Sequence, residues 1–434
     1  MSQPTRSTNS GHREQAMRKP NKLSVASVVY WLTAIFIASI VLDGPFRYLL
    51  NKIGLINLAY APKVLFLLAL PLLLIVRAKT NKGVLVGLSL VALSLVWGMV
   101  NLPSVKQALF GLWVLIPLLF GLLSARYIMN MVGSYSNLFL VMFIIAVTGV
   151  FISPVVHFPW MGQTLEIGGH AVINSRQWSA YGVDRYAGFS RASFSAASQA
   201  LIFAIWLVST RRSKLLKLLV WLSAGAAIAL TTSKGPFGAW IILGMFFLAN
   251  AVWRSRLIAR QTWVAVLSVI LSLSVLLPLS TLYVKYYFSG ASLTTRFLFN
   301  SFGQRLSWMW PDSLRLLRHP VEWIVGRGLG GIGAPQQYFE PTRYLAADNL
   351  FVYLCVDLGL PSAILVLSYP FFRIASAFLR ERRMVLPFAL LMAVITYGVV
   401  VNVVEDSLLS FIFALCIATG FSASDMREIG RDSR

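Results

Sequence analysis

The sequence predicts an all-α fold: a polytopic integral membrane helix bundle with about twelve transmembrane helices and a large extracytoplasmic loop containing short amphipathic helices. The chain of 434 residues is 57% hydrophobic and only 12% charged, with a mean hydropathy of +0.72. One soluble core could not bury that much apolar surface. The formal charge of +23 is better explained by basic loops that orient helices in a membrane than by a nucleic-acid partner.

The chain begins with a polar, basic stretch, residues 1–22, which has no cleavage site after a short apolar region. It is interpreted as a disordered cytoplasmic tail and not as a signal peptide. The transmembrane bundle then occupies residues 23–424, and residues 425–434 form a second cytoplasmic tail. A spanning helix needs about 20 apolar residues. By that measure the candidate spans are 24–43, 59–76, 83–100, 107–124, 137–156, 194–210, 215–232, 236–253, 262–281, 350–372, 384–403 and 407–423.

The second span is the weakest, because Lys63 lies near its start, and a count of about ten or eleven spans also fits. With a cytoplasmic N-terminus, more than half of the 38 basic residues fall inside, as the positive-inside rule expects. The loops 157–193 and 282–349 then face outwards, together with Asp43, Glu405 and Asp406. Both termini are then cytoplasmic. No repeat relates two halves of the chain, which counts against the major transporter folds.

Arginine is unexpectedly common in the two outward loops. Lipid headgroups account for some of these side chains. However, arginine is also favoured where planar, bidentate contact with phosphate is needed, so the cluster indicates an anionic lipid-linked substrate such as a diphosphate. The arginines concerned are Arg176, Arg185, Arg191, Arg296, Arg305, Arg315, Arg318, Arg327 and Arg343.

The second loop carries two recognisable patterns. Within 303–319, Leu306, Trp310, Leu314 and Leu317 recur at helical spacing, which predicts a surface helix that Pro320 ends. Interfacial anchoring alone would explain this pattern. The run 326–333 satisfies GxGxxG, but no strand precedes it and no helix opens from it, so a dinucleotide site is rejected. A flexible hinge or a backbone contact to phosphate is the preferred interpretation.

Three further features are ambiguous. Asp348-Asn349 is either a functional carboxylate at the mouth of the bundle or a plain helix N-cap, and the two readings are equally supported. Lys234 either contacts phosphate or only snorkels. Cys355 and Cys416 lie in apolar runs and are expected to be buried free thiols. The four histidines show no metal-ligand spacing, so neither a metal nor a cofactor is predicted.

In combination, these segments resemble the superfamily of O-antigen ligases and Wzy-type polysaccharide polymerases. The ligases of this superfamily share a pattern: His, then Asn, Ser or Gln, nine further residues, Gly, two more residues and a second Gly. This chain has a similar stretch, in which Asp348-Asn349 is followed by nine residues, Gly359, two residues and Ser362. Asp thus replaces the His, and Ser replaces the second Gly. Further similarity lies in Arg305-Leu306-Ser307-Trp308 with Pro320 and Gly326-Arg327-Gly328, in Gly188–Ser195, and in Thr232-Ser233-Lys234-Gly235.

The resemblance implies a metal-independent membrane glycosyltransferase of the bacterial inner membrane that acts on undecaprenyl-diphosphate-linked oligosaccharide. Arg191 and Arg305 are the first candidates for stabilising the diphosphate, and Arg185, Arg327 and Lys234 are the second. Asp348 is the candidate base or acceptor-orienting group. The implied partners are the lipid-linked oligosaccharide, the lipid bilayer and a chain-length regulator protein, with no nucleic acid.

The missing histidine favours a polymerase of O-antigen or exopolysaccharide over a ligase that transfers glycan to lipid A–core. A transporter or flippase of lipid-linked sugar is the alternative from another class. A peptidoglycan polymerase also has an outward loop with a key Asp, but its other signatures are not found in the sequence.

Overall fold

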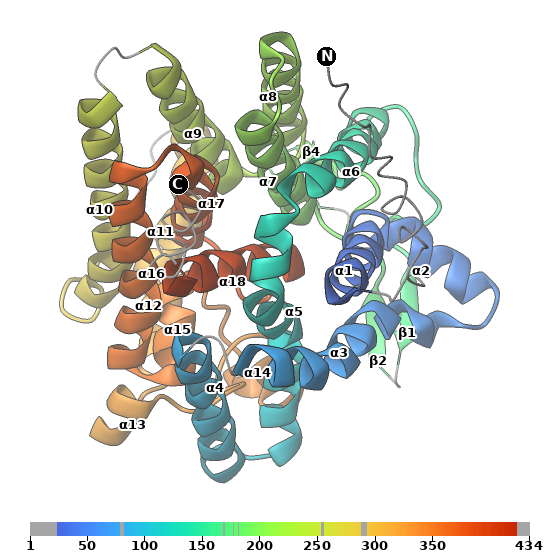
Figure 1. Cartoon of the computed structure of the whole chain (residues 1–434). Helices are drawn as coiled ribbons and strands as arrows, with labels where there is room; N and C mark the ends of the chain where they lie inside the picture. Colours follow the sequence, from blue (N-terminus) through green and yellow to red (C-terminus); the bar gives the residue numbers. More distant parts are fainter. Residues whose placement is uncertain are drawn as a thin grey trace, which may run out of the picture.

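The computed structural model describes residues 24–78, 82–167, 170–176, 178–180, 182–252, 256–287 and 293–422, and the two predicted tails lie outside these ranges. The described chain is overwhelmingly helical, with only two small two-stranded sheets (Figure 1). The predicted all-α class is therefore confirmed, and several of the helices are long and apolar enough to cross a membrane.

The first third of the chain is helical, with a sharp bend close to its start. Helix α1 ends at Val41, and α2 continues from Asp43 at an angle of 86°. The predicted span 24–43 is thus the first arm of a bent pair. The elements up to the first long loop are α1 Val25–Val41, α2 Asp43–Lys52, η1 Ile56–Tyr60, α3 Ala61–Ala78, α4 Lys82–Asn101, α5 Val105–Asn130 and α6 Val132–Ile152.

The first long loop contains the only strands found in the described ranges. They form two antiparallel hairpins, one pairing Thr164 with Ile173 and the other pairing Trp178 with Arg185. Four helices follow. The elements are β1 Thr164–Ile167, β2 His170–Ile173, β3 Trp178–Ala180, β4 Val183–Arg185, α7 Ser193–Thr210, α8 Lys214–Leu230, α9 Lys234–Val252 and α10 Arg256–Ser280.

The second long loop is built from short helices. The expected helix within 303–319 exists, but it starts earlier and ends earlier: α11 runs directly into the π-helical turn η2 and then into α12, which ends at Leu314. Pro320 begins the next helix instead of ending this one. The elements are α11 Leu293–Gln304, η2 Arg305–Met309, α12 Trp310–Leu314, α13 Pro320–Val325, α14 Ala334–Phe339 and η3 Pro341–Arg343.

The predicted span 350–372 is wrong as a single helix. Helix α15 stops at Leu358, and Gly359 adopts a positive φ of 83° between it and the next helix. Pro361 then sits in the first turn of α16, where proline is tolerated because those N–H groups have no partner within the helix. The last elements are α15 Leu350–Leu358, α16 Leu360–Arg380, η4 Arg382–Met384, α17 Val385–Gly398 and α18 Ser407–Ser422.

Among the described residues, eight helices meet the length and composition of a membrane span, and the bent pair α1–α2 would make nine. The predicted count of twelve therefore stays a prediction. Counting the bent pair as one span, the difference comes from α8, α17 and α18, which have 17, 14 and 16 residues.

The core lies where α18 packs along α5 (Figure 1). Phe66 of α3 stacks on Phe120 of α5 with ring centroids 3.6 Å apart, and Phe411 of α18 lies beside Phe120. Gly121 permits this close approach, because a Cβ there would lie 2.8 Å from the Phe411 carbonyl oxygen. Both cysteines are buried free thiols, as predicted.

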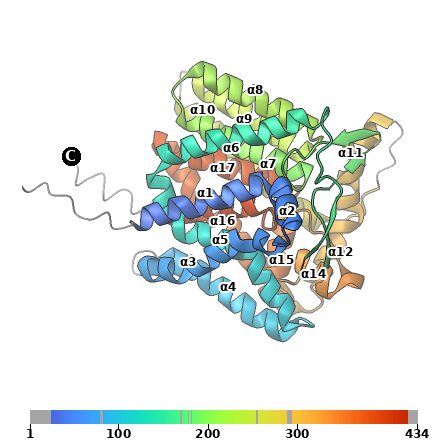
Figure 2. The ribbon, with the colours of Figure 1, turned by 90° about the vertical axis from the view of Figure 1, so that its right-hand side faces the viewer.

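The loop elements gather at one end of the bundle. Figure 2 shows α2, α11, α12 and α14 together at the right-hand end of the long helices. The candidate site is built from these elements and from the turns that join the long helices at this end.

Candidate functional site

Arg305 and Asp348 form an ion pair across the second long loop. The Arg305 Nη2 atom donates to Asp348 Oδ2 at 2.8 Å, and its Nη1 atom donates to the Ser301 carbonyl oxygen at 2.9 Å. Arg305 opens the π-helical turn, a distortion that shifts side chains relative to a regular helix and is frequent at functional sites. The sequence pattern did not predict this turn.

Asp348 is not the cap of α15. That role belongs to Asn349, whose Oδ1 atom accepts the Val352 N–H at 2.9 Å. Asp348 instead has a positive φ of 42°, a conformation that non-glycine residues adopt rarely and often at functional sites. The structure thus separates the two readings of this dipeptide: Asn349 caps the helix, and Asp348 holds Arg305.

Arg185 and Lys234 lie next to each other. The Arg185 Nε atom donates to Thr232 Oγ1 at 2.9 Å, and its Nη2 atom donates to the Thr232 carbonyl oxygen at 3.3 Å. Thr232 lies in the turn that leads into α9, whose first residue is Lys234. The first long loop is therefore fastened to the turn between α8 and α9.

These two cations share one cluster with Arg305. Burial lowers the pKa of Arg185; Tyr397 opposes this shift, and the positive charge of Arg305 adds to it. Lys234 in turn lies close enough to Arg185 and Arg305 to interact electrostatically with both. We call Arg185, Lys234, Arg305 and Asp348 the first cluster.

Arg191 lies in a second, neighbouring cluster. Burial and the nearby guanidinium of Arg47 lower its pKa, while Asp43 opposes the shift. Arg47 is itself paired with Asp43 at 2.7 Å, and the carbonyl oxygen of Arg191 accepts the N–H of Arg176 at 2.9 Å. We call Asp43, Arg47, Arg176 and Arg191 the second cluster.

Glu405 and Lys63 connect the two clusters. Lys63 of α3 interacts with Arg47, Asp43 and Arg191 of the second cluster and also with Glu405. Glu405 lies in the turn between α17 and α18 and interacts with Asp348 of the first cluster.

The Glu405 carboxyl group is half-buried, and its Oε1 atom accepts the N–H of Ala334 at the start of α14. Desolvation raises its pKa to about 7, and the negative charge of Asp348 adds to that shift. The hydrogen bond from Ala334 and the charge of Lys63 oppose it. Glu405 is therefore poised to exchange a proton near neutral pH.

Arg327 stands apart from both clusters. It is 8% exposed, and its Nη2 atom contacts Glu340 Oε2 at 3.0 Å. Its Gly-rich neighbours are buried as well: the Leu329 N–H donates to the Ser94 carbonyl oxygen, and Gln107 Nε2 donates to the Gly330 carbonyl oxygen. These contacts favour a role in packing against α4 and α5 over the predicted hinge.

Sequence reasoning assigns no site role to four members of this arrangement. Lys63 counts there only as a weak point in a span, and Asp43 and Glu405 only as outward charges. Arg47 was not considered. The available signal was a charged residue at each end of an apolar run, which is equally typical of ordinary helix ends.

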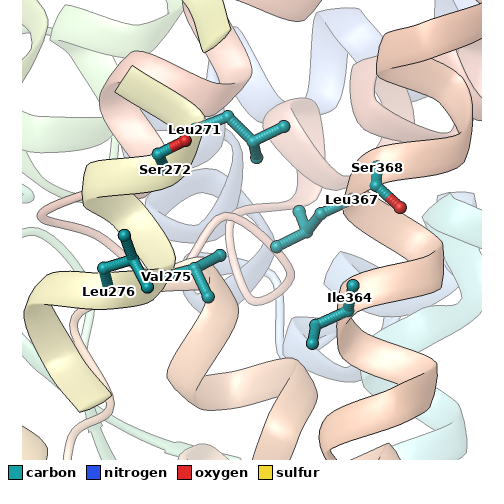
Figure 3. A pocket seen from close by; sticks show the side chains of 7 residues that line it. All are labelled: Leu271, Ser272, Val275, Leu276, Ile364, Leu367 and Ser368. Atoms are coloured by element: carbon teal, nitrogen blue, oxygen red, sulfur yellow. The ribbon is translucent and has the colours of Figure 1, made fainter. Parts of the chain in front are cut away.

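A cavity of about 250 Å³ lies between α10 and α16 (Figure 3). Two serines, Ser272 and Ser368, are its only polar lining residues within the described chain, so it offers no catalytic chemistry. The same stretch of α10 is joined to the residue after Asp348, because Asn349 Nδ2 donates to the carbonyl oxygen of Ser274 at 3.4 Å.

Comparison with known proteins yields no relative: no family model matches the chain, and no curated protein or solved structure matches it either.

Proposed function

We propose that this protein is a membrane glycosyltransferase that joins undecaprenyl-diphosphate-linked oligosaccharide repeat units into O-antigen or exopolysaccharide. One observation carries the proposal: Arg185, Lys234 and Arg305 come from three distant segments and meet beside Asp348. Several cations around few carboxylates suit a diphosphate, since arginine pairs with phosphate oxygens through two parallel hydrogen bonds.

In the proposed reaction, a hydroxyl group of the incoming repeat unit attacks C1 of the sugar at the reducing end of the growing chain. The bond between C1 and the diphosphate oxygen breaks, and undecaprenyl diphosphate leaves with the electron pair. The cations of the first cluster would stabilise the negative charge that develops on the leaving oxygen. The proton of the attacking hydroxyl group passes to a carboxylate.

Glu405 suits the role of base better than Asp348. A general base works best when its pKa lies near the working pH, and the pKa of Glu405 is about 7. Asp348 already accepts a hydrogen bond from Arg305, so its carboxylate is engaged in orienting that guanidinium. We therefore assign Glu405 as base and Asp348 as the group that positions Arg305.

A lipid-linked substrate also needs an apolar surface next to the cations. The cavity between α10 and α16 offers one, since Leu271, Val275 and Leu367 line it (Figure 3). The hydrogen bond from Asn349 to Ser274 connects this part of α10 to the residue after Asp348. The isoprenoid chain would lie along this surface, with its diphosphate at the first cluster.

The test is a polymerisation assay with lipid-linked repeat units and the Arg305→Ala variant. We expect the wild-type protein to yield a ladder of chain lengths and the variant to yield none, because the leaving group loses its guanidinium. Arg315→Ala is the matched control, since Arg315 belongs to the same loop but pairs with Asp312 at the surface. A normal ladder from a correctly inserted Arg305→Ala protein would overturn the proposal. Transfer of glycan to lipid A–core by the wild-type protein would indicate a ligase instead.

A further inference from the structure

A second, smaller cavity, whose lining shares no residue with either cluster, lies where the turn between α4 and α5 meets α13. It has a volume of about 180 Å³. Unlike the cavity between α10 and α16, it is lined mainly by polar and charged groups. The lining residues are Asn101, Pro103, Leu316, Arg318, His319, Glu322, Arg327 and Arg343.

Glu322 forms the buried, fixed part of this cavity. Its Oε2 atom accepts the N–H groups of Arg318 at 2.6 Å and His319 at 3.2 Å, and its Oε1 atom accepts from Asn101 Nδ2 at 3.2 Å. Burial would raise the pKa of Glu322, but these hydrogen bonds and the charge of Arg327 outweigh it and lower the pKa. Glu322 is thus ionised and holds the backbone of 318–319 in place.

Two arginines of this cavity keep their binding capacity. The Arg318 and Arg343 side chains are exposed, and neither guanidinium makes a hydrogen bond or ion pair with any residue that the structure describes. Arg327, by contrast, is already neutralised by Glu340. The cavity therefore presents two guanidinium groups that have no partner among the described residues. Its other unpaired charge, the Glu322 carboxylate, is already held by backbone N–H groups and the Asn101 amide.

From this geometry we propose that the cavity is a binding site for an oxyanion, either a phosphate or a carboxylate group on a small polar molecule. Guanidinium pairs bind such groups through charge-assisted hydrogen bonds. Two sources share this chemistry, the phosphate of an anionic lipid headgroup and the carboxylate of an acidic sugar. The site lies outside the two clusters, so the inference does not depend on the proposed reaction.

The experiment measures ligand binding by the purified full-length protein in zwitterionic nanodiscs, without any lipid-linked substrate. Inorganic phosphate and glucuronate are titrated separately, with glucose as the neutral comparison, and binding is followed by nuclear magnetic resonance of the ligand. The Arg318→Gln/Arg343→Gln double variant removes both guanidinium groups. Arg315→Gln is the matched control, because Arg315 is exposed in the same loop but does not line the cavity.

We expect weak binding of both anions, with Kd on the order of 1 mM, and an increase in Kd of about tenfold or more in the double variant. The Arg315→Gln protein should bind as the wild type does, and glucose should not bind. If incorporation of phosphatidylglycerol into the nanodiscs displaces phosphate from the wild-type protein, the lipid headgroup is the source; if glucuronate still binds there, the acidic sugar is. If the double variant bound phosphate and glucuronate as tightly as the wild-type protein does, the inference would be overturned.

Discussion

The ion pair of Arg305 and Asp348 is partly exposed, so we expect it to contribute little to stability, and the proposed function gives it another role. The side chains of Arg305 and Asp348 are 15% and 35% exposed, and ion pairs with such access to water typically contribute at most about 1 kcal/mol to folding. The positive φ of Asp348 opposes folding further. A strained carboxylate in a weak ion pair is better explained by the orientation of Arg305 than by stabilisation of the fold.

Glu405 gives the first prediction at the scale of single residues. Its pKa of about 7 in the folded protein exceeds the value of 4.5 expected in the unfolded chain. Between these values the folded protein keeps a proton that the unfolded chain has lost. The contribution of Glu405 to stability is therefore fully present below about pH 4.5 and is lost as the pH rises through 7. The groups facing it are the Ala334 N–H, Asn402, Asp348 and Lys63. Asp357, Tyr353 and Tyr344 also interact electrostatically with it.

We expect the Glu405→Gln variant to lose less thermal stability than the wild type between pH 5 and pH 8, with a difference of at most about 3 kcal/mol. Its polymerisation rate should also fall well below that of the wild type and lack the rise that the wild type shows as the pH increases to about 7. Thermal unfolding in detergent at both pH values measures the first effect. Glu166→Gln, at an exposed position in β1, is the control. Identical pH dependence in wild type and Glu405→Gln would contradict the environment described for Glu405.

At the scale of elements, the Gly-rich run 326–333 fastens the second long loop to α4 and α5. Gly330 has a φ of +87°, and a Cβ there would lie 2.6 Å from the carbonyl oxygen of Gln107. The same glutamine donates to the carbonyl oxygen of Gly330 and to Glu340 at 2.7 Å. Gly330→Ala should therefore force a shift in a buried network.

We expect Gly330→Ala to lower the free energy of unfolding by roughly 2–4 kcal/mol, from backbone strain and overpacking together. The control is Gly133→Ala, because Gly133 lies in α6 with no neighbouring atom within 4 Å of its added Cβ. That change should be neutral or slightly stabilising, since alanine favours helix. A drop in unfolding temperature of the same size in both variants would argue against the tight contact at Gly330.

The sequence predicted the elements whose pattern is local. Leu306, Trp310, Leu314 and Leu317 recur at helical spacing, and all four are buried as that spacing requires. The break at Gly359 was missed because hydropathy continues across it, although Gly359 and Pro361 are typical signals for a helix end and a helix start. The meeting of Glu405 with Lys63 could not be predicted, because it depends on how segments more than three hundred residues apart pack together.

At the scale of the whole molecule, contacts join segments that the charge pattern assigns to the same side. Arg185 of the outward loop 157–193 donates a hydrogen bond to Thr232, and Asn101 donates one to Glu322 of the other outward loop. Elsewhere, Arg211 donates a hydrogen bond to Asn137, and Arg260 donates one to the carbonyl oxygen of Leu379. These four residues lie in or beside segments that the charge pattern assigns to the inside. Each of these four contacts between described residues stays within one predicted side, as a single membrane orientation requires.

Labelling of introduced cysteines tests this orientation. Cys355 and Cys416 are at most 1% exposed, so the native thiols should give little background. Arg315→Cys lies in the second long loop, and Lys214→Cys lies at the start of α8, where the basic residues of the inside set gather. With a membrane-impermeant maleimide added to spheroplasts, we expect labelling of Arg315→Cys only, and labelling of both after the membrane is permeabilised. Labelling of Lys214→Cys alone in intact spheroplasts would reverse the orientation, and it would place the first cluster on the side where lipid-linked repeat units are made and not where they would be joined.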